Sequence, residues 1–430
     1  MQRSTASFTI TDTANVKQQI VSWANRFSIC CCLDNHNYGH TVSSYEYLVG
    51  AGAISVFSAE THALNLLDHY LDKNRDWLFG HVSYNLTYEL YGIASGKQST
   101  VQFPSFYFFR PEIVVEIKKG IVEISSFTSS PEHVWKEILQ TEIIAAENNY
   151  NSRFAINPRV TKEEYIATIH LIQQHILRGD CYELNYCQEF FAEKARINPL
   201  QVYQRLSAVS PNPFGAYYKN ADNYLLCASP ERFIKKTGSA ILSQPIKGTA
   251  KRNTSNKDAD DVLRNELQTS SKDRSENVMV VDLVRNDLSK ICKEGTVHVE
   301  ELFGIHSFPQ VHQMISTISG ELDDTISFTD ILKASFPMGS MTGAPKNKVI
   351  ELIEKYEPVS RGIFSGALGY FSPEQDFDFN VVIRSILYNQ STQYLSYFTG
   401  SGITFYSDAA TEFEECLLKG AAIEAVLKND

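Results

Sequence analysis

The sequence predicts an α+β fold in which antiparallel β-sheets form most of the core. Apolar runs rich in β-branched and aromatic residues recur along the chain, without the regular strand–helix alternation that produces a parallel sheet. Hydrophobic residues make up 43% of the 430 residues and aromatic residues 12%, including 25 Phe and 22 Tyr. A chain of this length and composition folds around a substantial core, as one large domain or as two or three ordinary ones.

The first 150 residues are rich in predicted strands, such as the aromatic run at 103–109 and the β-branched run at 113–117. Residues 30–32 are three consecutive cysteines. We expect a buried strand there, followed by a polar turn, in preference to a zinc site with the nearby His36 and His40. The polar, asparagine-rich segment 147–153 is the best candidate boundary. We therefore expect an N-terminal region at 1–150 and a second region at 151–430.

A helix is predicted directly after this boundary. Thr161 and Glu164 form a capping box, apolar residues follow at helical spacing, and Gly179 is typical of a helix end. Further helices are predicted in the charged region 256–288 and at 328–334, 346–355 and 409–427. Strands are predicted at 366–371, 380–388 and 394–405, because these runs are apolar and β-branched.

Charge and composition exclude several classes of function. The formal net charge is −11, which argues against nucleic acid as a partner because phosphate binding depends on basic patches. The first residues lack the apolar segment of a signal peptide, and no apolar run approaches the roughly 18 residues that span a bilayer. The eight cysteines are scattered without a C-x-x-C pair. We therefore expect no membrane association and a reducing compartment, the cytoplasm.

Two motifs in the second region carry candidate catalytic side chains. The segment 245–249 (PIKGT) places Lys247 between a proline and a glycine, and a lysine becomes nucleophilic only where burial or a neighbouring cation lowers its pKa. Glu231 precedes an arginine and a phenylalanine (SPERF), where an apolar setting would raise its pKa and suit a general acid. Taken alone, each motif is explained more simply as a feature of the protein surface. Lys247 would then be a solvated lysine, and Glu231 would form an ion pair with Arg232.

Pairs of acidic residues three apart recur on two predicted helices. Glu412 and Glu415, with Lys419 four residues further, share one helical face, and Asp273 and Glu276 repeat the spacing. Mg²⁺ binds a few carboxylates together with water and ligand oxygens, so two such pairs favour a magnesium site. Ordinary Glu–Lys surface faces are the alternative.

Glycine-rich turns and an arginine in an apolar run indicate binding groups. Residues 339–346 (GSMTGAPK), which include Ser340, are similar to a phosphate cradle at a helix start, but their spacing does not match a nucleotide-binding P-loop. Gly402 lies at the end of a predicted strand, where its N–H can face a carboxylate. Arg384 lies in the apolar run 381–387. Because arginine is seldom buried without a partner, it binds either a substrate carboxylate or an internal acid.

Together these segments resemble the chorismate-utilising enzymes, the family of anthranilate, aminodeoxychorismate, isochorismate and salicylate synthases. The similarity begins near residue 170, and the region 1–150 resembles the family only loosely. The resemblance implies two facing antiparallel β-sheets surrounded by helices, with chorismate as the substrate and Mg²⁺ as the cofactor. The matching motifs follow the family's order at 179–185, 229–233, 245–249, 276–287, 311–312, 336–346, 361–370, 383–385, 400–403 and 412–419.

The resemblance also implies roles for single residues. Three would act in catalysis: Lys247 as a nucleophile, Glu231 as a general acid, and His312 beside the substrate ring. Five would contact the substrate: Ser340, Phe364, Arg384, Gly402 and Lys419. Four would surround Mg²⁺, the first two as direct ligands: Glu276, Glu415, Asp273 and Glu412.

Lys247 distinguishes between branches of the family. The members that form 4-amino-4-deoxychorismate carry lysine in this motif, where it attacks C2 of chorismate while a glutamate protonates the departing C4 hydroxyl. Anthranilate synthases carry alanine there. Isochorismate- and salicylate-forming members carry a lysine base near position 183, where this chain has Glu183. Aminating members more often carry glutamine at that position, so the role of Glu183 is open.

The resemblance therefore implies the branch of aminodeoxychorismate synthase large subunits, which act in p-aminobenzoate and folate synthesis. The chain has no glutaminase triad and no lyase motif, so a separate glutamine amidotransferase would supply ammonia and a separate lyase would release pyruvate. The alternatives are an anthranilate synthase component I, an isochorismate or salicylate synthase, and a non-catalytic chorismate-binding scaffold subunit. The joint presence of Glu231, Lys247 and Glu276 argues against the scaffold.

Overall fold

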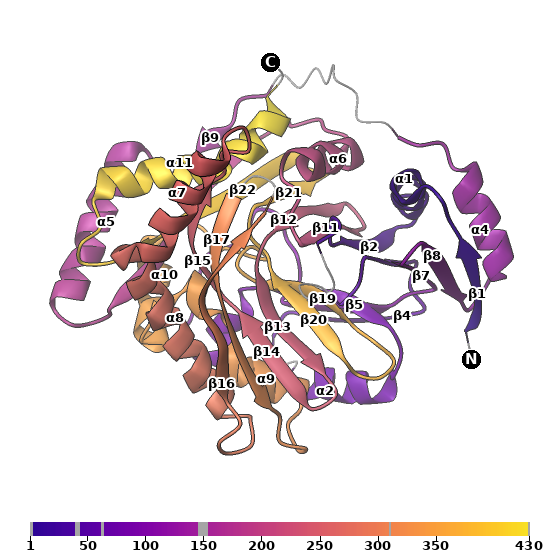
Figure 1. Ribbon diagram of the computed structural model, residues 1–430, viewed down its shortest axis with the longest axis horizontal. Coiled ribbons are helices and arrows are strands. Elements are labelled where there is room, and N and C mark those ends of the chain that lie inside the picture. The colour runs from indigo at the N-terminus through magenta and orange to yellow at the C-terminus, as the bar shows by residue number, and fades with distance from the viewer. Residues whose placement is uncertain (1–2, 39–43, 62–63, 145–153, 309–310, 429–430) are drawn as a thin grey trace.

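Two large antiparallel sheets pack face to face, and helices surround them (Figure 1). The computed structural model describes residues 3–38, 44–61, 64–144, 154–308 and 311–428. Neighbouring strands run antiparallel throughout these residues. The predicted α+β class with two facing antiparallel sheets is confirmed.

The larger sheet has twelve strands in the described part of the chain, and both regions of the sequence contribute to it. A short strand, β9 (Asn157–Pro158), pairs with β10 outside the main order. In spatial order the other strands are β1 (Ser4–Thr9), β8 (Ile121–Ser126), β7 (Ile113–Lys118), β3 (Tyr47–Ala51), β2 (Ile29–Asp34), β11 (Phe214–Asn220), β12 (Asn223–Ser229), β21 (Ser385–Asn389), β22 (Tyr394–Ile403), β10 (Glu183–Ala192) and β18 (Gly343–Ala344).

The smaller sheet has ten strands among the described residues, and β15 lies at one edge of it. The long strand β16 (His298–Ser307) pairs with β17 outside the main order. The remaining strands, in spatial order, are β15 (Ile246–Lys251), β17 (Val311–Glu321), β14 (Ala240–Gln244), β13 (Arg232–Thr237), β20 (Phe377–Val381), β19 (Ala367–Phe371), β5 (Leu78–Val82), β6 (Phe106–Arg110) and β4 (Ser55–Ala59).

The helices that the sequence predicted begin and end close to the expected positions, whereas the helices at 13–24, 64–73, 86–90, 131–140 and 199–209 were not predicted. Thr161 and Glu164 form the expected capping box at the start of α5, whereas the charged region 256–288 is divided at Ser270 into α7 and α8. None of the described helices is both long and apolar enough to cross a membrane. The helices are α1 (Thr13–Ala24), α2 (Leu64–Lys73), α3 (Leu86–Leu90), α4 (Pro131–Gln140), α5 (Lys162–Leu177), α6 (Pro199–Val209), α7 (Lys257–Thr269), α8 (Ser271–Ser289), α9 (Phe328–Ser335), the 3₁₀ helix η1 (Gly339–Met341), α10 (Lys346–Tyr356) and α11 (Ala409–Leu427).

Strand β2 shows how the larger sheet separates two hydrophobic cores. Cys31 lies in the core between the sheets, whereas Cys30 and Cys32 point to the opposite face, which packs against α1. All three thiols are free and buried, so the predicted buried strand is confirmed. His36 directs its ring nitrogen to a backbone carbonyl oxygen 2.8 Å away, and His40 lies outside the described residues.

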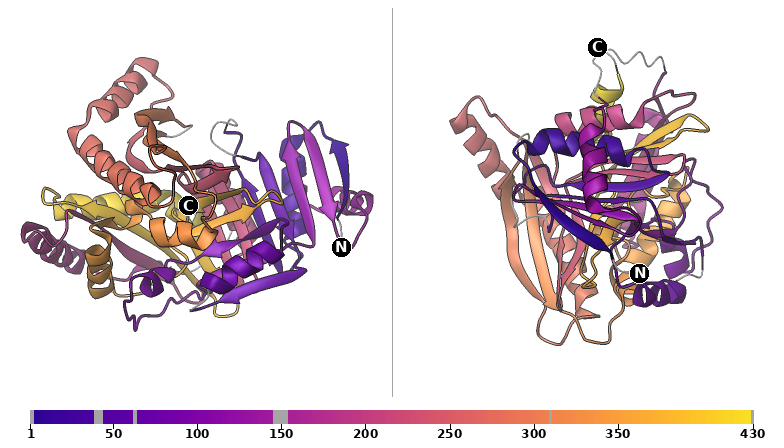
Figure 2. Two further views of the ribbon diagram at one scale, coloured as in Figure 1. Left: turned by 90° about the horizontal axis from the view of Figure 1, so that it is seen from below. Right: turned by 90° about the vertical axis from the view of Figure 1, so that its right-hand side faces the viewer.

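Strands from the N-terminal region continue both sheets. β2 pairs with β11 in the larger sheet and β5 pairs with β19 in the smaller one. Figure 2 shows the indigo and purple N-terminal strands at one end of the molecule, next to the strands of the second region. The candidate boundary segment at 147–153 lies outside the described residues.

The predicted strand at 380–388 is two strands in the structure. β20 ends in the smaller sheet and β21 begins in the larger sheet, so the chain crosses from one sheet to the other between them. Arg384 lies at this crossing with a φ of 50°, a left-handed conformation that regular strands do not contain. The sequence gives no sign of the break because both strands are buried and therefore both are apolar.

A buried ion pair connects β10, η1 and the end of α10. Arg361 donates to the Glu357 carboxylate from Nε at 2.9 Å and from Nη2 at 2.6 Å. Its Nη1 and Nη2 also donate to the carbonyl oxygens of Met341 at 2.7 Å and Asn185 at 2.9 Å. Glu357 accepts a further hydrogen bond from the backbone N–H of Cys187 at 2.8 Å. The pair is thus well bonded inside the protein, as a buried charge requires.

Substitution of Arg361 by methionine would leave the Glu357 carboxylate buried without its partner. We expect Arg361→Met to lower the free energy of unfolding, measured by urea denaturation, by about 3–5 kcal/mol. Arg285→Met, which breaks an exposed pair with Asp282, should lower it by less than about 1 kcal/mol. Equal losses in the two variants would contradict the structural role of the buried pair.

Candidate active site

Lys247 and Glu183 form a buried ion pair between the two sheets. Lys247 lies on β15, at the edge of the smaller sheet, and Glu183 begins β10 of the larger sheet. The distance from Lys247 Nζ to Glu183 Oε1 is 2.7 Å, and only 10% and 2% of the two side chains are exposed. A Cβ atom at Gly402 would lie 2.7 Å from this Oε1 and 3.1 Å from this Nζ, so the pair requires glycine beside it. Lys247 is therefore not a solvated surface residue.

The surroundings hold Lys247 as an ammonium ion. Burial acts to lower the pKa of Lys247, but the charges of Glu183 and then Glu276 outweigh burial and raise it. The sequence argument required a lowered pKa for a nucleophile, and the resting site does not provide one. A nucleophilic role therefore requires that the proton leave Lys247, and the hydrogen-bonded acceptor is the Glu183 carboxylate.

Glu231 lies in the turn between β12 and β13 and is buried. Burial raises the pKa of its carboxyl to about 7, against the smaller opposing effects of the Ser340 hydroxyl and the Lys247 charge. A carboxyl that holds a proton near neutral pH suits a general acid. The neighbouring Arg232 instead binds the Asp378 carboxylate at 2.8 and 2.9 Å, so the structure excludes the surface Glu231–Arg232 pair.

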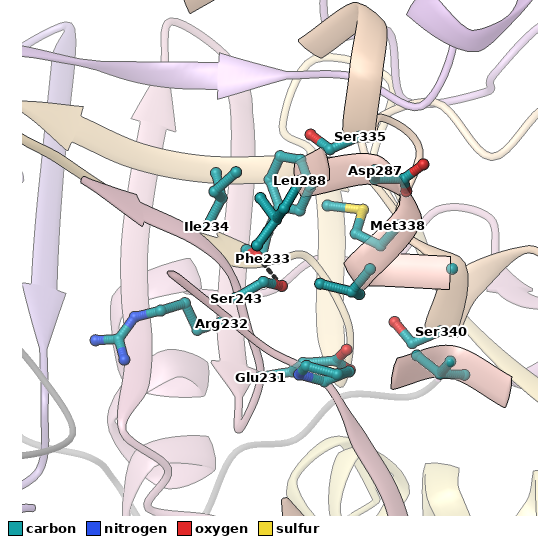
Figure 3. Close-up of a pocket in the computed structure, with 14 residues that line it drawn as sticks. Glu231, Arg232, Phe233, Ile234, Ser243, Asp287, Leu288, Ser335, Met338 and Ser340 are labelled. Carbon is teal, nitrogen blue, oxygen red and sulfur yellow. Dashed lines mark hydrogen bonds between the residues drawn. The ribbon is translucent and has the colours of Figure 1, made fainter. Parts of the chain in front are cut away.

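A narrow cavity adjoins Glu231 (Figure 3). Figure 3 shows Glu231 and Ser340 towards one end of this cavity, and Asp287 and Ser335 towards the other. The buried Ser340 hydroxyl lies close enough to Glu231 to influence the pKa of that carboxyl, but it makes no hydrogen bond of normal geometry to the described residues, so it can bond to a ligand. Most of the wall between the two ends is apolar and comes from β13, α8 and the segment before η1: Phe233, Ile234, Val280, Val284, Leu288 and Met338.

Arg384 adds a positive charge near Glu231. Within the described residues its guanidinium makes no hydrogen bond or ion pair, although Glu231 lies close enough to influence it. Burial lowers the pKa of Arg384, and Glu231 partly opposes this effect. The sequence left two possible partners for Arg384, a substrate carboxylate and an internal acid. No acid among the described residues forms an ion pair with it. The guanidinium can therefore bind a carboxylate from outside, in the paired geometry typical of arginine.

Acidic side chains of α8 and α11 form a second cluster. Glu412 is buried and accepts a hydrogen bond from Ser401 Oγ on β22. Glu415 Oε1 lies 2.8 Å from Lys419 Nζ, which also donates to a backbone carbonyl oxygen of β22 at 2.8 Å. Glu276 Oε1 is buried and makes no hydrogen bond to any residue in the described ranges, and burial raises the pKa of this carboxyl to about 7.

Asp273 joins this cluster to the strand of Lys247. The backbone of Gly248 has a φ of 89°, and a Cβ atom there would lie 2.9 Å from Asp273 Oδ1. Both the positive φ and the close approach require glycine. The glycine of the PIKGT motif thus allows the first turn of α8 to lie directly against β15.

Lys272 lies among these acids. Its Nζ is 3.4 Å from Glu412 Oε1 and 4.0 Å from Glu276 Oε1, so it links α8 to α11. In the ranges that the structure describes, no three Asp, Glu, His or Cys side chains converge closely enough to hold a metal ion. The carboxylate oxygens are of the type that Mg²⁺ prefers, but the ligand set is not assembled around one point. The sequence reasoning missed Lys272, although its spacing of four residues from Glu276 is a signal for contact on a helix.

Two further predicted residues make separate contacts. His312 is buried on β17, with Nε2 3.1 Å from Asp260 Oδ1 and Nδ1 2.8 Å from Ser307 Oγ. All three residues line a second, polar cavity of about 340 Å³ beside α7. Phe364 stacks on Phe398 with ring centroids 4.9 Å apart, inside the core between the sheets. His312 and Phe364 thus make these contacts with residues other than Lys247 and Glu183.

Comparisons with known proteins identify relatives of the chain. Residues 31–425 match the profile of the chorismate binding enzyme family. An anthranilate synthase component I-like protein from Synechocystis is 31% identical, over 86% of this chain and 76% of the relative. Aminodeoxychorismate synthase component 1 from Bacillus subtilis is 35% identical, over 62% of this chain. The match covers only 56% of the Bacillus protein, so the chain corresponds to little more than half of that relative's length.

The fold also has a solved counterpart. The crystal structure of anthranilate synthase component I from Streptococcus pneumoniae is similar with a TM-score of 0.76, over 89% of this chain and 92% of that chain. The sequence identity is 23%, so this likeness concerns the fold alone. The family match extends over nearly the whole sequence and includes every residue of the buried clusters described above. The chain belongs to the chorismate-binding enzyme family.

Proposed function

We propose that the chain is the large subunit of an aminodeoxychorismate synthase, which converts chorismate and ammonia to 4-amino-4-deoxychorismate. The observation that carries this proposal is the 2.7 Å contact between Lys247 and Glu183, buried near the protonatable Glu231. These groups provide a nucleophile, its proton acceptor and an acid for the leaving hydroxyl. The similarity to the Bacillus protein named aminodeoxychorismate synthase component 1 supports the same assignment.

The first step forms a covalent bond between the enzyme and the substrate. Lys247 transfers a proton to the Glu183 carboxylate, and the neutral amine attacks C2 of chorismate. The ring double bonds shift towards C4, and the C4 hydroxyl leaves as water after Glu231 donates its proton. Positioned proton transfer of this kind contributes about 10²–10⁴-fold to a rate.

The second step replaces the lysine with ammonia. Ammonia attacks C4, the ring double bonds shift back, and the bond between C2 and Lys247 breaks. The released amine recovers its proton from Glu183, and the new C4 ammonium returns a proton to Glu231. All three side chains are then in their initial states, and the net change is the exchange of hydroxyl for amine at C4.

Cations around the site account for the binding of a dicarboxylate substrate. We propose that Arg384, which makes no ion pair with any residue that the structure describes, binds one carboxylate, and that Lys419 and the N–H of Gly402 contribute further contacts. Bound Mg²⁺ would neutralise the ring carboxylate of the substrate. We propose four acids around it, the first two as ligands: Glu276, Glu415, Asp273 and Glu412. Two observations support this site: Glu276 Oε1 makes no hydrogen bond to any described residue, and all four side chains are carboxylates, which Mg²⁺ prefers.

The ammonia is proposed to come from a separate subunit. Relatives from Bacillus and Salmonella carry the name component 1, which implies a second component in those proteins. We propose that the partner of this chain is a glutamine amidotransferase, and that the product serves p-aminobenzoate and folate synthesis.

A second candidate function is that of an anthranilate synthase component I. The relative from Synechocystis carries that name, and an anthranilate synthase alpha subunit of Arabidopsis is 34% identical over 62% of this chain. This activity aminates C2 and releases pyruvate, so it does not use a lysine that occupies C2. The buried Lys247 favours amination at C4.

The product of the isolated chain with chorismate, Mg²⁺ and ammonium, separated by chromatography, tests the proposed function. We expect 4-amino-4-deoxychorismate, and we expect Lys247→Ala to slow its formation by at least about 10²-fold because the nucleophile is lost. Lys251→Ala is the matched control, since this exposed lysine ends the same strand and should be neutral. Anthranilate or isochorismate as the wild-type product would contradict amination at C4.

Glu183→Gln tests the proton acceptor, because glutamine keeps the shape of the side chain but cannot take the proton from Lys247. We expect kcat near pH 7 to fall by about 10²-fold. If Glu183 acted only as a counter-ion, its loss would instead lower the pKa of Lys247 and free the amine. A rate equal to or above that of the wild type would therefore exclude the proton-acceptor role.

The pKa of about 7 for Glu231 is expected to limit the rate at high pH. As the pH rises through this value the carboxyl loses the proton that the leaving hydroxyl needs, so kcat/KM should fall about tenfold per pH unit above it. Glu231→Gln should lower kcat/KM by about 10²–10⁴-fold and remove this pH dependence. The measurement is kcat/KM at saturating Mg²⁺ from about pH 5.5 to about pH 9. An unchanged decline in the variant would assign it to another group.

A further inference from the structure

A lysine ammonium lies where the acidic side chains of α8 and α11 approach each other. Lys272 Nζ is 3.4 Å from Glu412 Oε1 and 4.0 Å from Glu276 Oε1. The exposed fractions of the side chains are 56% for Lys272, 14% for Glu276 and 2% for Glu412. The acids are thus inside the protein, and the lysine reaches them from the solvent side.

Charge balance explains why a cation is needed at this position. Glu412 is buried, and within the described residues Lys272 is its ion-pair partner and the neutral Ser401 hydroxyl donates a hydrogen bond to it. Glu415 already has its own cation in Lys419, 2.8 Å away. A buried carboxylate without a counter-charge is costly, so Lys272 compensates Glu412. It also attracts Glu276, on which the charge of Lys247 acts as well.

The same position cannot hold an ammonium ion and a divalent metal together. Like charges about 4 Å apart repel by about 1–4 kcal/mol per unit charge at the dielectric constants typical of protein surfaces, and a dication doubles this repulsion. Lys272 can leave, because it is in the first turn of α8 and has a flexible four-carbon chain that is more than half exposed.

We propose that Lys272 is a displaceable internal cation, which neutralises Glu276 and Glu412 in the metal-free protein and moves into solvent when Mg²⁺ binds to these acids. The inference rests on the magnesium site of the proposed function. Lys272 then controls the affinity for the metal, because the Lys272 ammonium group has to move away from the acids each time a Mg²⁺ ion binds. Mg²⁺ therefore binds more weakly than the four carboxylates alone would allow.

Calorimetric titration of the metal-free full chain with MgCl₂ tests this inference. We expect Lys272→Met to bind Mg²⁺ about tenfold more tightly than the wild type, because no ammonium ion has to be displaced. Lys272→Arg keeps the charge and should bind with wild-type affinity or more weakly. Lys290→Met is the matched control: it removes a half-exposed lysine that caps the far, C-terminal end of α8 and pairs with the buried Asp287, and it should leave the Mg²⁺ affinity unchanged.

Thermal unfolding gives an independent readout of the same exchange. Without metal, Lys272→Met should melt below the wild type, because Glu412 loses its counter-ion. With saturating Mg²⁺ the order should reverse or the gap should close, since the rise in Tm on adding a ligand grows with its affinity. A variant that is less stable by the same amount with and without Mg²⁺ would overturn the inference.

The product assay run on the same proteins separates this inference from the proposed function. If Lys272→Met and the wild type bind Mg²⁺ equally while 4-amino-4-deoxychorismate is formed, the displaceable lysine is wrong and the function stands. If neither protein binds Mg²⁺, the lysine inference and the magnesium site fail together. If binding tightens in Lys272→Met but chorismate gives another product, the lysine inference holds and the assigned reaction is wrong.

Discussion

One buried guanidinium positions the segments that carry the candidate site. Arg361 donates to the backbone of Asn185 on β10 and of Met341 in η1, while its carboxylate partner at the end of α10 holds it in place. The planar fork of arginine fixes the direction of these bonds as well as their length. Glu183 is two residues from the first contact and Ser340 is next to the second. Arg361 thus helps to fix the relative placement of these two side chains, together with the backbone hydrogen bond from Asn185 N–H to the Thr342 carbonyl oxygen at 2.7 Å.

The reactive groups lie where the two sheets meet, and this location explains their protonation. Lys247 comes from an edge strand of one sheet and Glu183 from the other, so both are removed from water by the packing of the sheets. Glu231 is buried at the same junction and keeps a proton near neutral pH. The site thus combines a neutral acid, which is the state that a leaving hydroxyl needs, with a charged lysine, which has to give a proton to Glu183 before its amine can act as a nucleophile.

Local patterns in the sequence predicted several helices and the fold class, whereas contacts between residues far apart in the sequence could not be predicted. The capping box at Thr161 and the acidic face of α11 could be read from the sequence because each depends on residues within one or two turns. The break at Arg384 could not, since buried strands on either side have the same apolar composition. The motifs indicated Lys247 but not its contact with Glu183, because 64 residues separate the two and only the assembled sheets bring them together.

Each sheet contains neighbouring strands that are far apart in the sequence, and this affects how the chain folds during synthesis. Leu33 of β2 pairs with Ala216, and Val82 of β5 pairs with Ala367. The N-terminal strands therefore leave the ribosome long before their partners exist, and their edges stay open in the meantime. Such distant pairing slows folding, and unpaired edges favour association between chains. The protein is expected to reach its native state only after the last third of the chain has emerged, and to depend on chaperones until then.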